Sequence, residues 1–225
     1  MPLRAEQALR VAIVGAESTG KTTLACTLAT RLAADTGLRV TWVPEWLREW
    51  CAHTGRTPMA HEQAAVLRGQ QERITAACAC HDIVVCDTTA LMTAVYSQQI
   101  FADHSLDARA LELHARMDMT LLMALDLPWV ADGVQRDGPQ VQAPVDALLR
   151  DMLEAQRRPW ALVGGSGDAR LDHAMAALRP LLRTRLNAAT NLFTRLDDRG
   201  APSAHRRWSC SCCDAPACER PLRVR

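Results

Sequence analysis

A single lysine marks a glycine-rich segment near the start of the chain. Lys21 is the only lysine among 26 lysines and arginines, and it lies in GAESTGKT at residues 15–22. This spacing fits the pattern G-x-x-x-x-G-K-[ST], in which backbone N–H groups surround phosphate oxygens and a flexible ammonium reaches the outer phosphates. We therefore expect this loop to bind a nucleoside triphosphate. The expected contacts are Gly15, Ala16, Glu17, Ser18, Thr19, Gly20, Lys21, Thr22 and Thr23.

Carboxylates follow two other apolar segments and can complete a metal site. Asp87 comes after the run 83–86, and Asp126 comes after the run 120–125. In nucleotide-binding loops the hydroxyl of the final Ser or Thr shares Mg²⁺ with such a carboxylate. We expect Thr22 and Asp87 to hold Mg²⁺, with Asp126 as the second choice. Either aspartate can instead serve as a helix cap.

The segment VPEWLRE at residues 43–49 adds groups that can act on a second substrate. Glu45 follows an apolar run, and ligands of parallel sheets bind at the carboxyl ends of strands. Its carboxylate can accept a proton from a substrate hydroxyl, while Arg48 can orient substrate or phosphate. Both residues also suit the solvated start of a helix. Trp46, and Trp129 further along, flank the predicted crevice and can stack on a base.

Residues 128–144 are rich in Gly, Pro and Asp and show no clear periodicity, which indicates a long loop. Long loops without structure are uncommon unless they are functional. We interpret this segment as a lid that closes on ATP and places Arg136 against the transferring phosphoryl group. An ordinary surface loop is the alternative. Lys21, Glu45, Asp87 and Arg136 are therefore the expected catalytic residues.

The period of the apolar residues switches between strand-like and helix-like, which is typical of an α/β fold. Strands are predicted at 11–14, 38–43, 83–86, 120–125 and 160–163. Helices are predicted at 21–34, 45–51, 61–80, 90–100, 107–116, 145–157 and 168–196. Five short apolar strands favour a parallel sheet with helices on both faces, as in P-loop kinases. Residues 1–196 would form this domain, followed by a linker and a short Cys-rich basic tail at 197–225.

Composition limits the classes of partner. The formal net charge of +1 provides no field that would attract nucleic acid or an anionic membrane. The longest apolar runs are too short to span a bilayer, and residues 1–10 lack the apolar stretch of a secretory signal. We expect a cytoplasmic protein that binds neither membrane nor nucleic acid. The sequence leaves its oligomeric state open.

Four of the nine cysteines crowd into the tail. Cys210, Cys213 and Cys218 are spaced so that their thiolates can reach one tetrahedral ion, with Cys212 or His205 as a fourth ligand. We therefore consider a structural Zn²⁺, although the full C-x-x-C…C-x-x-C pattern is missing and a reduced tail is the alternative. The other cysteines are expected in the core, and the histidines before the tail at the surface or at caps.

Several of these segments together resemble the ribosylnicotinamide kinase domain of the NadR family. The matching pieces are GAESTGKTTL at 15–24, EWLRE at 45–49, CDTT at 86–89 with Tyr96 and Ser97, and PWVADG at 128–133 with Arg136. The strand and turn at 160–166, followed by Arg170, is similar to the adenine-side loop of that family. The resemblance spans residues 8–185.

The resemblance implies transfer of a phosphoryl group from Mg-ATP to the 5′-hydroxyl of nicotinamide riboside, which gives nicotinamide mononucleotide. Glu45 and Asp87 would share the base and magnesium duties. Ser166 would contact the nucleotide. The residues implied for the nucleoside are Glu45, Trp46, Arg48, Trp129 and Asp132.

The chain also departs from that family. NadR proteins carry a nucleotidyltransferase domain before the kinase, whereas only residues 1–10 precede the first predicted strand here, so we expect no adenylyl transfer. Trp46 and Thr89 stand where the family leads us to expect a tyrosine and a more polar residue, which puts the identity of the nucleoside in question.

Two other functions stay open at this stage. One is a regulatory ATPase linked to NAD metabolism that acts through a partner bound at the Cys-rich tail. The other is a kinase of the same fold for a different nucleoside or nucleotide. Glu45 and Arg136 favour a kinase, because a regulatory switch needs no substrate base. The tail favours the ATPase, because a minimal kinase does not need it.

Overall fold

The computed structural model describes residues 8–130 and 138–189. The chain divides into two compact units, Met1–Pro180 and Leu181–Arg225. The strands and the candidate site described below lie in the first unit. Of the second unit the described part is residues 181–189, the end of a helix that contains Pro180. The predicted domain boundary at 196 and the Cys-rich tail, with Cys210, Cys213 and Cys218, lie outside the described residues.

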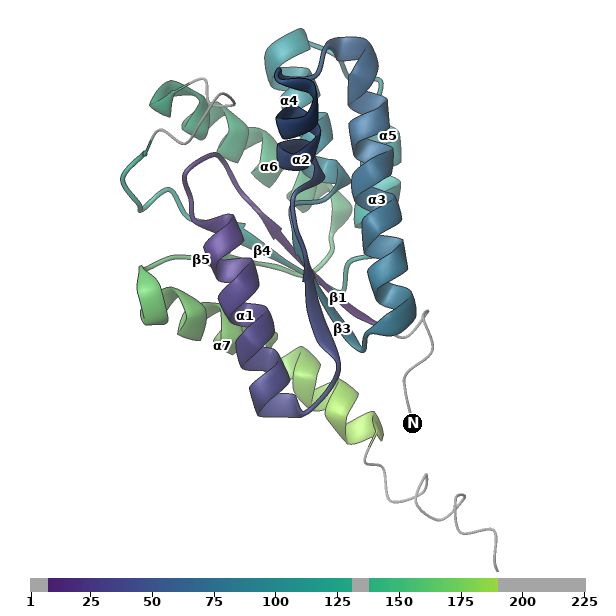
Figure 1. Ribbon diagram of the computed structural model, residues 1–225. Helices are drawn as coiled ribbons and strands as arrows, with labels where there is room; N and C mark the ends of the chain where they lie inside the picture. The colour runs from purple at the N-terminus through teal and green to yellow at the C-terminus, as the bar shows by residue number, and fades with distance from the viewer. Residues whose placement is uncertain (1–7, 131–137, 190–225) are drawn as a thin grey trace, which may run out of the picture. The chain divides into compact units, whose positions relative to one another are not determined.

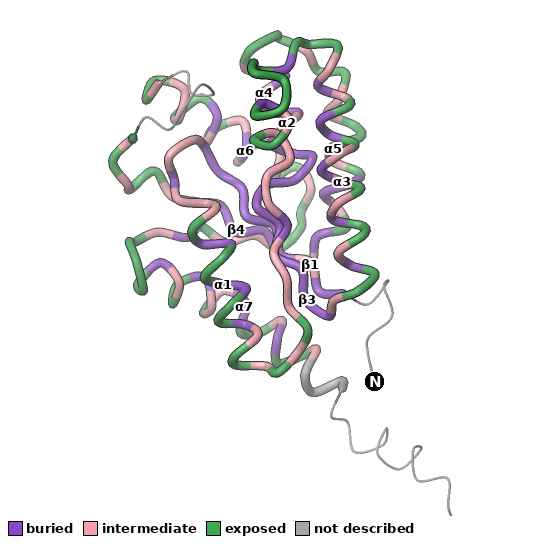
Figure 2. The backbone as a smooth tube through the Cα atoms, in the orientation of Figure 1, coloured by how far each residue is buried: buried purple, intermediate pink, exposed green. Residues whose placement is uncertain are grey.

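A five-stranded parallel sheet forms the centre of the first unit (Figure 1). Its strands are β1 (Leu9–Val14), β2 (Val40–Val43), β3 (Ile83–Asp87), β4 (Met119–Met123) and β5 (Trp160–Val163), in the order β2-β3-β1-β4-β5. The three central strands are buried almost throughout (Figure 2), because helices cover both faces of the sheet. All five predicted strands are confirmed.

Helices cover both faces of this sheet, as predicted (Figure 1). Side chains of α3, α4 and α6 share one core cluster with Ala12 and Val14 of β1. Helix α1 and the first turns of α7 cover the opposite face, where Arg31 of α1 lies near Asp168 and Asp172. The helices are α1 (Lys21–Thr36), α2 (Trp46–Thr54), α3 (Gln63–Cys80), α4 (Ala90–Phe101), α5 (Asp107–His114), α6 (Gln142–Gln156) and α7 (Gly167–Ala189).

The loop predicted at 128–144 is shorter than expected. A 3₁₀ turn, η4 (Pro139–Val141), leads directly into α6, whose Val145 and Leu149 are buried. Pro139 and Pro144 made this stretch look like a loop, but proline is tolerated in the first turn of a helix, where its missing N–H has no intrahelical partner. None of the helices in the described ranges combines the length and hydropathy required to cross a membrane.

The prediction that the cysteines before the tail lie in the core was partly wrong. Cys51, Cys78 and Cys86 are buried as expected, whereas Cys26 and Cys80 are exposed. Their helices, α1 and α3, present a polar face to solvent at those positions, and a small thiol is tolerated there.

His114 was expected at the surface but is buried between two threonines. Its Nδ1 lies 3.1 Å from Thr89 Oγ1, and its Nε2 lies 2.9 Å from Thr120 Oγ1. The Thr89 hydroxyl also accepts the N–H of Leu91 and so caps α4. The ring therefore ties the start of α4 to β4, and burial lowers the pKa of His114 to about 4. The apolar residues three positions before and after it, Leu111 and Met117, indicate a buried helix face, whereas the polarity of histidine favoured a surface position.

We predict that His114 makes stability fall as the pH drops from 7 to 5. Because the folded pKa, about 4, lies below the unfolded value of 6.5, the unfolded chain binds the extra proton in that window. Urea unfolding should show the wild type losing about 2 kcal/mol more over this range than the His114→Gln variant. Equal pH dependence of the two proteins would show that His114 titrates normally.

Candidate functional site

The loop between β1 and α1 has the backbone that phosphate binding requires. Gly15 has φ +153°, and a Cβ there would lie 2.8 Å from Met123 Cβ, so a side chain does not fit. Gly20 is the N-cap of α1 with φ +78°, and Ser18 is also left-handed with φ +57°. Such a turn aims successive N–H groups at one point, and the N-terminus of α1 adds its partial positive charge.

Lys21, the first residue of α1, lies half-buried at the end of this loop. Its ammonium donates a hydrogen bond of 2.8 Å to the carbonyl of Ala16. Burial lowers the pKa of Lys21, while the carboxylates of Glu45 and Asp87 act in the opposite direction. The ammonium is thus the counter-charge for two acidic groups, Glu45 just after β2 and Asp87 at the end of β3.

Thr22 and Asp87 meet as expected for a magnesium site. The Thr22 hydroxyl donates a 2.6 Å hydrogen bond to Asp87 Oδ2, while Asp87 Oδ1 is buried and has no hydrogen-bond partner among the described residues. Burial raises the pKa of Asp87, and the bond from Thr22 opposes that shift. A hydroxyl and a carboxylate side by side fit Mg²⁺, which takes oxygen ligands and draws most of them from phosphates and water.

Asp126, the second choice for magnesium, is committed elsewhere. Its Oδ1 forms an ion pair with Arg170, and its Oδ2 accepts the N–H of Gly165 at 2.6 Å. It therefore joins β4 to the turn after β5 and does not reach Thr22. Across residues 8–130 and 138–189 no group of three or more His, Cys, Asp or Glu side chains is placed to hold a metal.

A strained turn carries the chain from Asp87 into α4. Thr88 has φ +70°, which is rare for a β-branched residue, and its side chain is buried. Its N–H donates to the carbonyl of Ile13 at 3.0 Å, and its carbonyl accepts a 3.4 Å bond from the Gln70 amide. These bonds hold the strained conformation, which places Thr88 in the wall of a pocket beside the phosphate loop.

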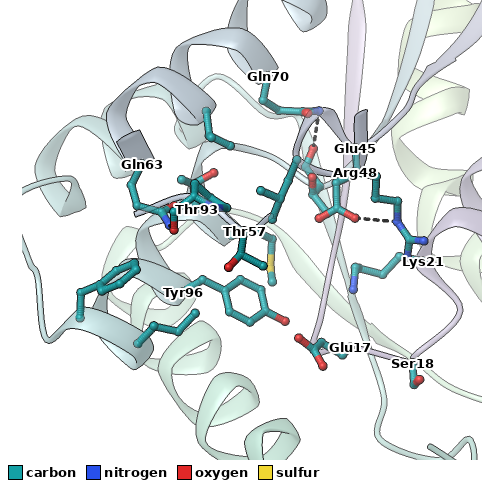
Figure 3. A pocket seen from close by; sticks show the side chains of 17 residues that line it. Glu17, Ser18, Lys21, Glu45, Arg48, Thr57, Gln63, Gln70, Thr93 and Tyr96 are labelled. Atoms are coloured by element: carbon teal, nitrogen blue, oxygen red, sulfur yellow. Dashed lines mark hydrogen bonds and ion pairs between the residues drawn. The ribbon is translucent and has the colours of Figure 1, made fainter. Parts of the chain in front are cut away.

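That pocket has a volume of about 240 Å³ and opens between the phosphate loop and helices α2, α3 and α4 (Figure 3). Charged groups gather at the loop end, where Lys21, Glu17, Glu45 and Arg48 lie together. The far end is mostly apolar, with a few uncharged polar groups. Its lining includes Leu47, Thr57, Pro58, Gln63, Val66, Gln70, Met92, Thr93, Tyr96, Ile100 and Phe101.

Glu45 and Arg48 lie at this loop end, where the sequence placed them. Glu45 is the last residue before α2, and its Oε2 accepts a 3.0 Å hydrogen bond from Arg48 Nε. The Glu45 side chain is 15 % exposed, so the ion pair is partly shielded from water. A carboxylate in this position can accept a proton from a hydroxyl group that enters the pocket.

Trp46 does not line the pocket, contrary to the expectation that it stacks on a base. Its indole packs on Gly69 of α3, and the Arg73 guanidinium lies 4.2 Å above the ring. Arg73 also pairs with Glu49 at 2.5 Å, and the backbone N–H of Trp46 donates to Gln70 Oε1 at 2.7 Å. Trp46 therefore fastens α2 to α3 and so holds Glu45 in place.

Both stems of the predicted lid contact the phosphate loop. The Ser18 hydroxyl donates to the Val130 carbonyl at 2.6 Å, and the Gln142 amide donates to the Glu17 carbonyl at 2.7 Å. Trp129 is not among the residues that line the pocket; its indole N–H is buried and has no partner within the described ranges. Asp132 and Arg136 lie outside the described residues. Ser166 is exposed in the turn before α7.

Sequence reasoning missed most of the far end of the pocket. Gln63 and Gln70 are 4 % and 3 % exposed, and with Val66 they form one face of α3 that turns into the pocket. Two glutamines within an apolar helical stripe were the available signal, because buried amides need partners. Tyr96 is the only tyrosine in the chain, and Figure 3 shows its hydroxyl directed toward the loop end.

The sheet order β2-β3-β1-β4-β5, the loop after β1 and the Thr22–Asp87 pair define a P-loop nucleotide-binding domain with a kinase-like fold. A family profile described as AAA domain matches residues 10–170. The chain therefore belongs to this AAA domain family. No curated protein gives a significant sequence match.

Solved structures share the fold. NadR in complex with NR aligns with a TM-score of 0.63 and 21 % identity, over 79 % of this chain and 51 % of NadR. NadR in complex with NAD and AMP-PNP aligns with a TM-score of 0.64 and 21 % identity, over 79 % of this chain and 50 % of NadR. Thymidylate kinase from Ehrlichia chaffeensis aligns with a TM-score of 0.53 and 16 % identity, over 77 % of this chain and 98 % of the kinase. The chain thus spans about half the length of NadR, and the resemblance read from its motifs is confirmed in the fold.

We predict that Gly69→Ala disturbs the packing of Trp46 between α2 and α3 and lowers the free energy of unfolding. The new Cβ would lie 2.6 Å from Trp46 Cδ1, and Arg73 prevents the indole from moving away freely. Urea unfolding should show a loss of about 1–3 kcal/mol, typical of overpacking. Adding Trp46→Leu should recover part of this loss in a double-mutant cycle. A gain of about 1 kcal/mol, as for an ordinary helical Gly→Ala change, would contradict the packing described.

Proposed function

We propose that the protein is a nucleoside kinase that transfers the γ-phosphoryl group of Mg-ATP to a 5′-hydroxyl, with nicotinamide riboside as its first-choice acceptor. The observation that carries the proposal is the shared pocket of Lys21 and Glu45. One group is placed for the phosphates and the other for the attacking hydroxyl. Phosphoryl transfer needs little more from a protein than positioning and charge neutralisation.

The nucleotide end is built by the phosphate loop. The loop N–H groups and the Lys21 ammonium would neutralise the β- and γ-phosphates, and Thr22 and Asp87 would hold Mg²⁺. When bound, the ion withdraws charge from the phosphate oxygens. The buried Asp87 Oδ1, without a protein partner among the described residues, suits this role, because an unpaired buried carboxylate oxygen is otherwise costly.

The acceptor end is built around Glu45. Its carboxylate would accept the hydroxyl proton as the oxygen attacks the γ-phosphorus, and Arg48 would orient that carboxylate. The acceptor's sugar would therefore lie at the charged loop end. Its base would lie among the apolar side chains of α3 and α4, where Gln63 and Tyr96 offer hydrogen bonds.

Charge favours a nucleoside over a nucleotide as acceptor. Lys21 and Arg48 are the basic residues in the described lining of the pocket; the first belongs to the phosphate loop and the second pairs with Glu45. Glu17 adds a second carboxylate. A phosphorylated acceptor needs additional cations, which the described lining does not offer, whereas a nucleoside needs none.

Support for nicotinamide riboside in particular comes from the NadR motifs and from the shared fold with NadR in complex with NR. The fold shared with thymidylate kinase keeps other acceptors as the second candidate. The Arg136 lid and the Cys210, Cys213 and Cys218 zinc site are retained as predictions, to be tested by Arg136→Gln and by metal analysis of the full chain.

The direct test is ADP release by the purified protein with Mg-ATP, with and without nicotinamide riboside and a panel of other nucleosides and nucleoside monophosphates. Strong stimulation by nicotinamide riboside with a mononucleotide product is the expected result. Stimulation by a different nucleoside would keep the mechanism and replace the substrate. Slow hydrolysis that no acceptor stimulates would reject the kinase in favour of a regulatory ATPase.

We predict that Glu45→Gln lowers kcat by about 100-fold or more, because the amide cannot accept the proton. The KM for ATP should change by no more than about threefold, since Glu45 is placed on the acceptor. Glu112→Gln is the matched control, an exposed glutamate on α5 that pairs with Arg109. Unchanged turnover in Glu45→Gln would remove this residue as the base.

Lys21→Ala should abolish transfer while the protein keeps its circular dichroism spectrum, because the ammonium neutralises the phosphates and its loss leaves the sheet intact. Activity close to that of the wild type would reject the assignment of this loop.

A further inference from the structure

Arg170 is a buried arginine that contacts the phosphate loop on the side away from the pocket. It lies in the first turn of α7, and its side chain is 5 % exposed. It does not line the pocket described above. Its Nη1 donates to the carbonyl of Thr19, its Nε donates to the carbonyl of Gly165 at 2.6 Å, and its Nη2 pairs with Asp126. A single guanidinium therefore joins three segments.

Asp126 completes this arrangement. Its second oxygen accepts the N–H of Gly165, so the Arg170–Asp126 pair satisfies both backbone groups of that glycine. The close fit excludes side chains here, because a Cβ on Gly164 would lie 2.9 Å from Asp126 Oδ2. Burial raises the pKa of Asp126, but the Gly165 N–H and Arg170 outweigh it and lower the pKa overall. The carboxylate is thus ionised as a partner for Arg170.

The bond to Thr19 fixes the orientation of the next N–H group. A trans peptide is planar, so the carbonyl of residue 19 and the N–H of Gly20 point in opposite directions. Because the Thr19 carbonyl faces Arg170, the N–H of Gly20 faces away from it, toward the inside of the loop. Arg170 Nη1 also lies 3.5 Å from the position of a Cβ on Gly20, so it packs directly against the back of this residue.

This contact addresses a specific weakness of the loop. Gly20 has φ +78°, and glycine loses more conformational freedom on ordering than any other residue. Without an external partner the Thr19–Gly20 peptide could rotate and remove one donor from the anion site.

We propose that Arg170, held by Asp126, is a positioning residue for the polyphosphate of the nucleotide: it locks the Thr19–Gly20 peptide so that the loop is preorganised for phosphate. The proposal rests on nucleotide binding as set out under the proposed function, but it is independent of the identity of the acceptor. The turn at Gly165 is held by the same guanidinium, so it is coupled to the phosphate loop.

The test measures binding of Mg-ATP and of inorganic tripolyphosphate by titration calorimetry, with no acceptor present. Arg170→Gln should weaken both by a similar factor of roughly 10 or more, the loss expected for hydrogen bonds from a charged group. Arg170→Lys, which keeps the charge but not the fork geometry, should fall between Arg170→Gln and the wild type. Arg109→Gln on the surface of α5 is the matched control and should bind both ligands normally.

The outcomes separate the explanations. Weaker ATP binding with unchanged tripolyphosphate binding would overturn the proposal, because Arg170 would then act on the base side. Unchanged binding of both ligands would overturn it as well. If Arg170→Gln fails to fold, Asp126→Asn provides the same comparison with the arginine still present, and it should weaken both ligands in parallel. In assays with an active acceptor, the acceptor KM should stay constant in Arg170→Lys. Since binding is measured without acceptor, failure of the nucleoside kinase proposal would leave these results unaffected.

Discussion

The interaction on which the rest of the site depends is that of the half-buried Lys21 ammonium with two nearby carboxylates. An ammonium partly removed from water is stabilised by negative charge, which Asp87 at the end of β3 and Glu45 just after β2 provide. Parallel pairing of β2, β3 and β1 brings those strand ends to one edge of the sheet. The order of the strands therefore decides which carboxylates lie near this ammonium.

Local sequence was sufficient for the parts of the fold that are set by short-range patterns. The five strands are short and mainly apolar, and the loop at 15–22 carries its own glycines, so both could be predicted. The start of α6 could not, because Pro139 and Pro144 suit a loop and a first helical turn equally well. Only packing of the following turns against the core distinguishes the two.

The site likewise contains residues whose positions follow from local sequence and residues whose positions depend on packing. The positions of Lys21, Thr22, Glu45 and Asp87 were predictable because each stands at the end of a strand, in the loop that follows it, or in the first turn of the next helix. The direction of a side chain further along a helix depends on what packs beside it, and here the prediction for Trp46 was wrong. Its ring is held by a glycine and an arginine of α3, 23 and 27 residues later, and no local pattern indicates that pairing.

The central place of β1 in the sheet has a consequence for how this protein can change. Strands β2 and β3, with α2 to α4, lie on one side of the phosphate loop, and β4 and β5 with the Gly165 turn lie on the other. Under the proposed function, the acceptor would lie mainly on the β2–β3 side, while the nucleotide would be held by the loop, by the Gly165 turn and by Asp87 of β3. Under that function, substitutions in the pocket wall formed by α3 and α4 would change the acceptor without touching the phosphate loop, so such a scaffold would acquire a new acceptor while its phosphoryl donor stays the same.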